Sequence, residues 1–243
     1  MSLLFVFLAS YCAGVITLIF SFGLNVMLVP VLAIFIPIHL AIAFTGVNFV
    51  LYNSIRVAIT WRYISWKVVL KFTPLAIIGV IIGGALLNYA LIVFKPKTLE
   101  IIMGIMLLAI VFLELFKVIE KLKLNNNIFL FAGGFISGFA GGLIGSQGPF
   151  RVSALLNLKL NYQTFLATNA VLGLIIDGFR VICYFFTFLH FSELFQPIML
   201  VTILGSILGF LTLYKFTKYI KMEKLKPLII VLIVGLVGFM IFS

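Results

Sequence analysis

Long apolar runs joined by short polar links recur along the whole 243-residue chain. Hydrophobic residues make up 64% of the sequence and charged residues only 9%, whereas soluble domains carry about 25% charged residues. A helix needs about 20 mostly apolar residues to cross a bilayer, and several runs have that length. Runs such as 75–87 do not alternate polar and apolar residues, so they do not fit a transmembrane barrel. The sequence therefore predicts an all-α, polytopic membrane protein.

The chain contains two similar halves, 1–122 and 123–243, within one integral membrane domain. An offset of 123–124 residues brings similar residues into register, and a polar link at 117–127 separates the two halves. Repeats of this kind indicate two copies of one structural unit. The matched pairs are Ala43 with Ala167, Thr45 with Asn169, Arg56 with Arg180, and Pro74 with Pro197.

Each half predicts the same order of elements. A first helix ends at a glycine-rich break, and a short apolar stretch too short to cross a bilayer follows. Three full-length helices complete the half. The predicted ranges in the first half are 3–22, 26–36, 40–60, 72–94 and 98–116. Those in the second half are 128–144, 150–158, 163–188, 195–214 and 227–242.

The loop charges decide how the halves are oriented. If each broken segment were a single crossing, eight Lys and Arg residues would face one side and six the other. If the broken segment instead enters and returns, or crosses twice, the second half is inverted, and twelve basic residues face one side. Only Lys95 and Lys97 then face the other. Cytoplasmic loops carry an excess of basic residues. The sequence therefore predicts inverted repeats in the cell inner (plasma) membrane, with both termini on the outer side.

Inverted repeats with interrupted helices are typical of secondary transporters, which bind substrate near the bilayer midplane. The net charge of +11 fits basic cytoplasmic loops, so we expect no nucleic acid partner. An intramembrane enzyme would need paired acids, a metal cluster or a nucleophile–base pair. The chain has six acidic residues, of which only Asp177 lies deep in a predicted helix. Two distant histidines make no metal site, and we expect no cofactor. A passive anion channel or a non-transporting scaffold stays open as an alternative.

The second break, Gly145-Ser146-Gln147-Gly148-Pro149, is the first candidate anion site. Its glycines leave backbone N–H groups free, and the helix that follows directs the positive end of its dipole at the gap. Arg151 adds a full charge one turn later. Gly134, Gly138 and Gly142 have the spacing of close helix contacts, and we expect them to serve packing.

The first half retains only part of this pattern, namely Gly23 and Asn25. Asn25 could complete the pocket by hydrogen bonding, or it could cap the short helix after it. Polar residues on the two matched long helices, among them Thr45, Asn48, Asn53, Thr168 and Asn169, would suit oxyanion oxygens if they faced the breaks. Singly, such residues more often bond helix to helix.

Two arginines lie inside long apolar segments, which costs about 2.5–3.5 kcal/mol each on insertion scales. Arg56 is close enough to the cytoplasmic loop to extend to the membrane interface, and this alternative stays open beside a binding role. Arg180 lies too deep for that. Asp177 is on the same helix face three residues earlier, and we expect it to form an ion pair with Arg180. The arginines could therefore be ligands, gates or structural elements.

The order of motifs resembles the sulfite exporter TauE/SafE family over nearly the whole chain. In the first half the resemblance is carried by the break, Pro30 and Ala41-x-Ala43-x-Thr45. In the second half it is carried by Gly138-Phe139-Ala140-Gly141-Gly142-Leu143-Ile144-Gly145-Ser146-Gln147-Gly148-Pro149, followed by Phe165-x-Ala167-Thr168-Asn169. The aromatic-basic loop Trp61-Arg62-Tyr63-Ile64-Ser65-Trp66 is also similar.

This resemblance implies transport of a small sulfur-containing anion such as sulfite, a sulfonate or thiosulfate. It also implies that an ion gradient drives transport, with a proton or cation as the coupling ion; a homo-oligomer is left open. Two departures from the family pattern bear on which anion is carried. In the first break, the residues from Leu24 to Met27 replace glycines, and Ser153 replaces the second-half proline.

Overall fold

The computed structural model describes residues 2–20, 24–115, 126–216, 235 and 238. Within these ranges every regular element is a helix. In the first half these are α1 (Ser2–Phe20), α2 (Leu24–Ala33), α3 (Ile38–Thr60), η1 (Trp61–Tyr63), α4 (Trp66–Val93) and α5 (Pro96–Leu115). In the second half they are α6 (Asn126–Ile144), α7 (Gly148–Leu156), α8 (Tyr162–Phe185), η2 (Phe191–Phe195) and α9 (Pro197–Phe216). The prediction of an all-α membrane protein is confirmed. The helix predicted over 227–242 lies outside the described residues except at 235 and 238.

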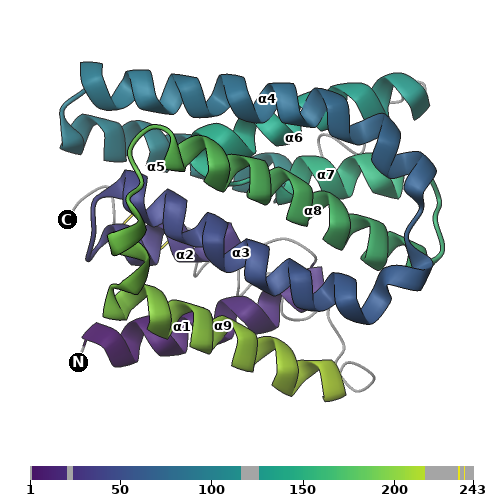
Figure 1. The fold of residues 1–243 in the computed structure, drawn as a ribbon, viewed down its shortest axis with the longest axis horizontal. Coiled ribbons are helices and arrows are strands. Elements are labelled where there is room, and N and C mark those ends of the chain that lie inside the picture. Colours follow the sequence, from purple (N-terminus) through teal and green to yellow (C-terminus); the bar gives the residue numbers. More distant parts are fainter. Residues whose placement is uncertain (1, 21–23, 116–125, 217–234, 236–237, 239–243) are drawn as a thin grey trace.

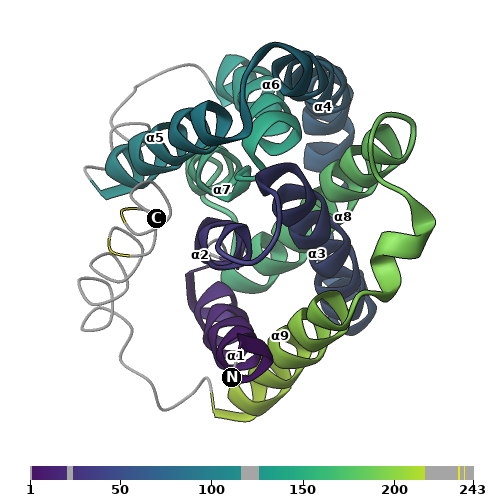
Figure 2. The ribbon, with the colours of Figure 1, turned by 90° about the vertical axis from the view of Figure 1, so that its left-hand side faces the viewer.

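Three of these helices are long and apolar enough to cross a membrane, namely those over Ile38–Tyr63, Trp66–Val93 and Tyr162–Phe185. They run along the long axis of the molecule (Figure 1). Viewed from the side in Figure 2, the short helices α2 and α7 lie in the middle, with the longer helices around them. The two interrupted segments therefore occupy the interior of the bundle.

The predicted start of the helix over 72–94 was wrong by six residues. Helix α4 begins at Trp66 and contains Pro74 in its interior. The basic residues Lys67 and Lys71 precede the predicted range and were counted among the twelve loop charges of one side, but they belong to the first turns of α4. The long charged side chains of such residues can reach the interface from a helix end, so their charge does not mark the end of the loop.

Glycines bring α4 and α6 into close contact, as the small-residue spacing predicted. A Cβ on Gly138 would lie 1.9 Å from the carbonyl oxygen of Ala76, and one on Gly142 would lie 2.4 Å from that of Val80. The contact positions increase together along both helices, so α4 and α6 run parallel. Helices α1 and α9 form a second parallel pair, in which Gly205 and Gly209 face the backbone of α1.

Helices α3 and α8 cross at the centre and run antiparallel. Gly46 of α3 lies against Arg180 of α8, whereas Asn53, seven residues further along α3, lies against Gly173, seven residues earlier on α8. Among the described residues, this crossing carries eight of the 18 buried polar or charged side chains. It also brings both intramembrane arginines of the matched segments toward α7 and the second break.

Candidate functional site

Three arginines and one aspartate lie inside the bundle. Arg151, Arg180 and Asp177 are 0% exposed, and Arg56 is 4% exposed. The Arg56 side chain is therefore enclosed by protein, and its guanidinium carbon lies 5.8 Å from the ring centroid of Tyr52, one turn back on α3. Four charged groups of net charge +2 are thus removed from water, which is strongly unfavourable unless the charges are compensated.

Arg180 has its compensating charge within its own helix. Its guanidinium lies 2.8 Å from a carboxylate oxygen of Asp177, both side chains being fully buried. The contact is an ion pair by distance but does not meet hydrogen-bond geometry. The other Asp177 oxygen accepts a hydrogen bond from the side-chain amide of Gln147, and Arg180 also donates to the carbonyl of Gly141 at 3.3 Å. We call these residues, together with Gly145 and Thr45, the Arg180 cluster.

The chain turns between α6 and α7 directly beside this ion pair. Gly145 has φ +75°, a conformation that L side chains rarely adopt, and a Cβ there would lie 2.8 Å from Arg180 Nη1 and 3.7 Å from Thr45 Oγ1. Asn25 of α2 donates its side-chain amide to the carbonyl of Gly145. Asn25 therefore links the first half to the second break. Glycine is required at 145 because φ is positive there and because Arg180 leaves no space for a side chain.

The remaining residues of this break are also buried. Ser146 and Gln147 are each 1% exposed, and the backbone carbonyl of Gln147 accepts a 3.0 Å hydrogen bond from the Ser137 hydroxyl. The hydroxyl of Ser146 and the side-chain oxygen of Gln147 have no hydrogen-bond partner in the described part of the chain. Helix α7 begins at Gly148, with proline in its first turn, and carries Arg151 inward.

A second group, which we call the Arg151 cluster, consists of Asn53, Arg56, Arg151 and Asn169. Arg151 Nε donates a 2.7 Å hydrogen bond to Asn169 Oδ1, which leaves both terminal nitrogens of Arg151 without a hydrogen-bond partner among the described residues. A Cβ on Gly173 would lie 2.8 Å from Asn53 Nδ2 and 3.0 Å from Arg151 Nη1. The Asn53 amide and the Arg151 guanidinium are therefore neighbours across the bare backbone of Gly173.

Arg56 completes this cluster from α3. Both of its terminal nitrogens, and both polar side-chain atoms of Asn53, have no hydrogen-bond partner within the described ranges. Arg56 is close enough to Arg151 for their charges to repel, and Arg151 is within electrostatic range of Asp177. Asp177 is the only described acidic side chain that is fully buried, and it already contacts Arg180. The two cations of the Arg151 cluster thus have no acid of their own among the described residues.

The family model described as "Sulfite exporter TauE/SafE" matches residues 6–240 of this chain. The chain belongs to that family. The family is described as one of sulfite exporters, and the three helices long and apolar enough to cross a membrane agree with a membrane transporter. No curated protein and no solved structure matches the chain.

The sequence analysis singled out most of the polar residues in the two clusters of this TauE/SafE protein. It did not predict which of them lie together. Asn53 was expected only as one of several hydrogen-bonding groups, and the glycines that give the arginines space, Gly46 and Gly173, were missed. An isolated glycine inside a long helix often marks a close approach, and that signal was present at both positions. Gly23 lies outside the described residues.

Two other polar residues of the long helices bond within the protein. Thr168 accepts a 3.0 Å hydrogen bond from the backbone N–H of Ser65, before α4. Asn48 accepts a 2.7 Å hydrogen bond from the Ser206 hydroxyl of α9. These residues hold helices together. Within the described ranges, no three His, Cys, Asp or Glu side chains come together as a metal would require.

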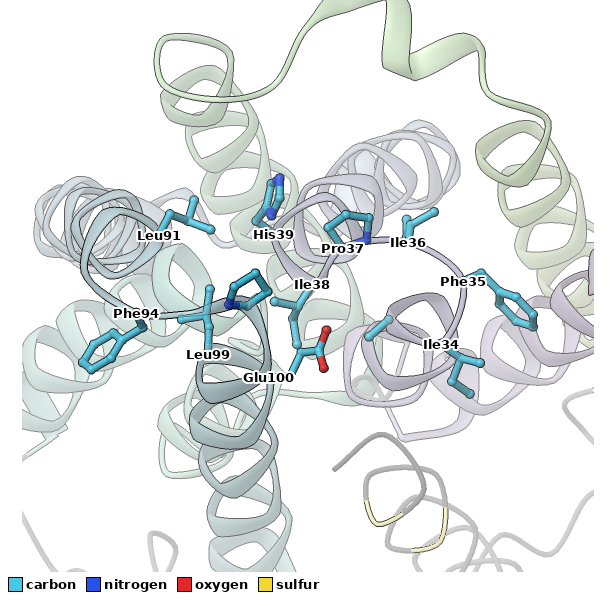
Figure 3. Close-up of a pocket in the computed structure, with 12 residues that line it drawn as sticks. Ile34, Phe35, Ile36, Pro37, Ile38, His39, Leu91, Phe94, Leu99 and Glu100 are labelled. Atoms are coloured by element: carbon cyan, nitrogen blue, oxygen red, sulfur yellow. The ribbon is translucent and has the colours of Figure 1, made fainter. Parts of the chain in front are cut away.

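A cavity of about 540 Å³ opens at the α2–α3 and α4–α5 connections of the TauE/SafE protein (Figure 3). Its walls are mainly apolar, with His39 and Glu100 as the polar members. Glu100 lies 3.8 Å from Lys97. None of the buried arginines lines this cavity, and its acidic member does not suit an anion. This cavity is therefore separate from the two arginine clusters.

Proposed function

We propose that this protein is a secondary transporter that carries small sulfur-containing anions, such as sulfite, a sulfonate or thiosulfate, across the plasma membrane. The anion is held near the bilayer midplane, where α7 and the second break meet the α3–α8 crossing. One observation carries this proposal: the guanidiniums of Arg56 and Arg151 are buried and have unused N–H groups among the described residues.

Uncompensated buried charge supports a ligand of opposite sign. Truncating one partner of a buried ion pair typically costs about 3–5 kcal/mol, because a charge stays behind without a partner. In the protein without a ligand, the arginines of the Arg151 cluster are already buried charges without an ion-pair partner among the described residues. A bound oxyanion removes it by accepting charge-assisted hydrogen bonds, which are about twice as strong as neutral ones. Planar guanidiniums also match the oxygens of such anions geometrically.

The helix arrangement supports two inverted units, 1–122 and 123–243. The matched helices α3 and α8 run antiparallel, as an inverted pair must. The first helix of each half pairs in parallel with the fourth element of the other half, α1 with α9 and α6 with α4. Secondary transporters of this architecture rock one unit against the other around a central site. Both termini are then outside, and a proton or cation gradient drives the movement.

Alternating access also fits the closed state of the clusters. The four buried charged side chains are at most 4% exposed, so this conformation opens the site to neither side. A passive channel would need a continuous polar path through the bundle, and a scaffold would not need unpartnered cations. Flux that saturates with substrate and follows an ion gradient separates the transporter from the channel.

The test is anion binding and flux by the purified protein. Sulfite, sulfate, thiosulfate, sulfonates and carboxylates are compared for the rise in unfolding temperature in detergent, since a ligand that binds only the native state stabilises it. Arg151→Ala should abolish both the shift and proteoliposome flux, whereas the control Arg62→Ala, in the exposed loop, should abolish neither. Undiminished flux by Arg151→Ala would remove Arg151 from the site. No shift with any anion on the wild-type protein would end the proposal.

A further inference from the structure

The two matched arginines differ in the residue one turn before them. The segment Asn53-Ser54-Ile55-Arg56 in α3 corresponds to Asp177-Gly178-Phe179-Arg180 in α8. Where the second half has a carboxylate, the first half has a neutral amide. Both halves therefore have the arginine, but only the second half has the acidic residue.

This difference divides the buried charge into two parts. Asp177 lies 2.8 Å from Arg180, so the Arg180 cluster is electrically balanced. Asn53 is neutral and cannot balance the charge of Arg56. Arg151 is within electrostatic range of Arg56, and its hydrogen-bond partner Asn169 is also neutral. Asp177 is also within electrostatic range of Arg151, but it contacts Arg180. The four buried charged groups therefore keep a net charge of +2, and the two buried cations without an ion-pair contact among the described residues, Arg56 and Arg151, both lie in the Arg151 cluster.

We infer that the transported species is a doubly charged oxyanion, and that it binds in the Arg151 cluster and not at the Gly145–Gly148 break. This inference rests on the proposed function and specifies the charge and location of its substrate. A dianion neutralises Arg56 and Arg151 together. A monoanion leaves one buried cation without a partner, which is the unfavourable state described above. At the break, the carboxylate of Asp177 already holds Gln147 and Arg180 and repels an anion.

The free groups of the cluster suit an oxyanion. The unpartnered terminal nitrogens of Arg56 and Arg151 and the amide nitrogen of Asn53 are all donors. They come from two helices, α3 and α7. The bare backbone of Gly173 on α8 lies against two of them. Burial strengthens each of these hydrogen bonds relative to water.

Thiosulfate and methanesulfonate test the charge directly, because both carry an SO₃ group and differ in the fourth substituent, a charged sulfur or a neutral methyl. We expect thiosulfate to bind the wild-type protein at least about tenfold more tightly, the effect of one hydrogen bond to a charged group. Sulfite should bind more tightly as rising pH removes its second proton, while thiosulfate affinity stays constant over the same range.

The location is tested by Asn53→Asp, which copies the Asp177–Arg180 pair into the first half. This variant should lose the preference for thiosulfate over methanesulfonate, and so should Arg56→Gln, which removes the charge instead. Asn48→Asp is the matched control: it places a new acid in the same helix, where residue 48 faces the Ser206 hydroxyl. It should keep the preference. Arg56→Gln also serves if Asn53→Asp fails to fold.

The outcomes separate this inference from the proposed function. If the wild-type protein binds methanesulfonate as tightly as thiosulfate, the charge assignment is overturned while anion transport stands. If Asn53→Asp and Arg56→Gln both retain the preference, the location is overturned. If no anion of the full panel, sulfite and sulfate included, binds the wild-type protein, the proposed function itself fails.

Discussion

Gly173 offers a sharp test of the Arg151 cluster, because it lies where a single methyl group must intrude on two of the proposed ligands. In Gly173→Ala, the new Cβ would start 2.8 Å from Asn53 Nδ2 and 3.0 Å from Arg151 Nη1. Both distances are shorter than normal contacts. Because these atoms end flexible side chains, they can move away and the helix can persist. The substitution should therefore disturb binding more than folding.

The magnitude follows from two opposing effects. Replacing glycine by alanine inside a helix stabilises it by about 0.5–1 kcal/mol. Forcing one extra carbon into a packed interior costs about 1–3 kcal/mol. Gly178→Ala is the matched control in the same helix, because a Cβ at 178 meets nothing within 4 Å. We therefore expect Gly178→Ala to be the more stable variant, by about 1–3 kcal/mol.

Anion affinity gives the more specific readout. Displacing Arg151 Nη1 removes one hydrogen bond between charged groups, worth about 1.5–3 kcal/mol, so the anion should bind Gly173→Ala at least about tenfold more weakly. Unfolding in detergent, with and without thiosulfate, measures both stability and affinity. If Gly173→Ala is stabilised like Gly178→Ala and binds anion like the wild type, then the positions assigned to Asn53 and Arg151 are wrong.

Two further predictions concern the ion pair and the topology. Asp177→Asn should lower the free energy of unfolding by about 3–5 kcal/mol, because the Arg180 charge stays buried without its partner. The double variant with Arg180→Gln should recover part of that loss, and a double-mutant cycle that shows simple additivity would contradict the pairing. For the topology, Lys97→Cys should react with a membrane-impermeant thiol reagent from outside intact cells, and Lys67→Cys should not. Labelling of both positions from the same side would contradict the inverted arrangement.

Much of the fold could be predicted because a membrane helix is recognisable from its own stretch of sequence. The lengths of apolar runs and the glycines at 145 and 148 place α6, α7 and α8 to within a few residues, since the hydrocarbon core sets helix length. The start of α4 could not be predicted in the same way. Pro74 and the basic residues before it resemble a loop boundary, but the helix continues through them to Trp66.

The site was predicted less completely, and for a physical reason. Residue type and depth suffice to single out Arg151 and Arg180, and helical spacing suffices to pair Asp177 with Arg180. Contacts between different helices depend on their rotation and crossing, which one sequence does not contain. For that reason the proximity of Arg151 to Asn53, across Gly173, could be found only in the structure.

The most direct measurement locates the anion itself. Selenate is a doubly charged analogue of sulfate, and its selenium scatters X-rays anomalously. In crystals of the protein soaked with selenate, we expect an anomalous peak between Arg56 and Arg151, with its oxygens within hydrogen-bond distance of both guanidiniums and of Asn53. A peak at the break between Gly145 and Gly148, or no peak at concentrations that stabilise the protein, would contradict the role assigned to the Arg151 cluster.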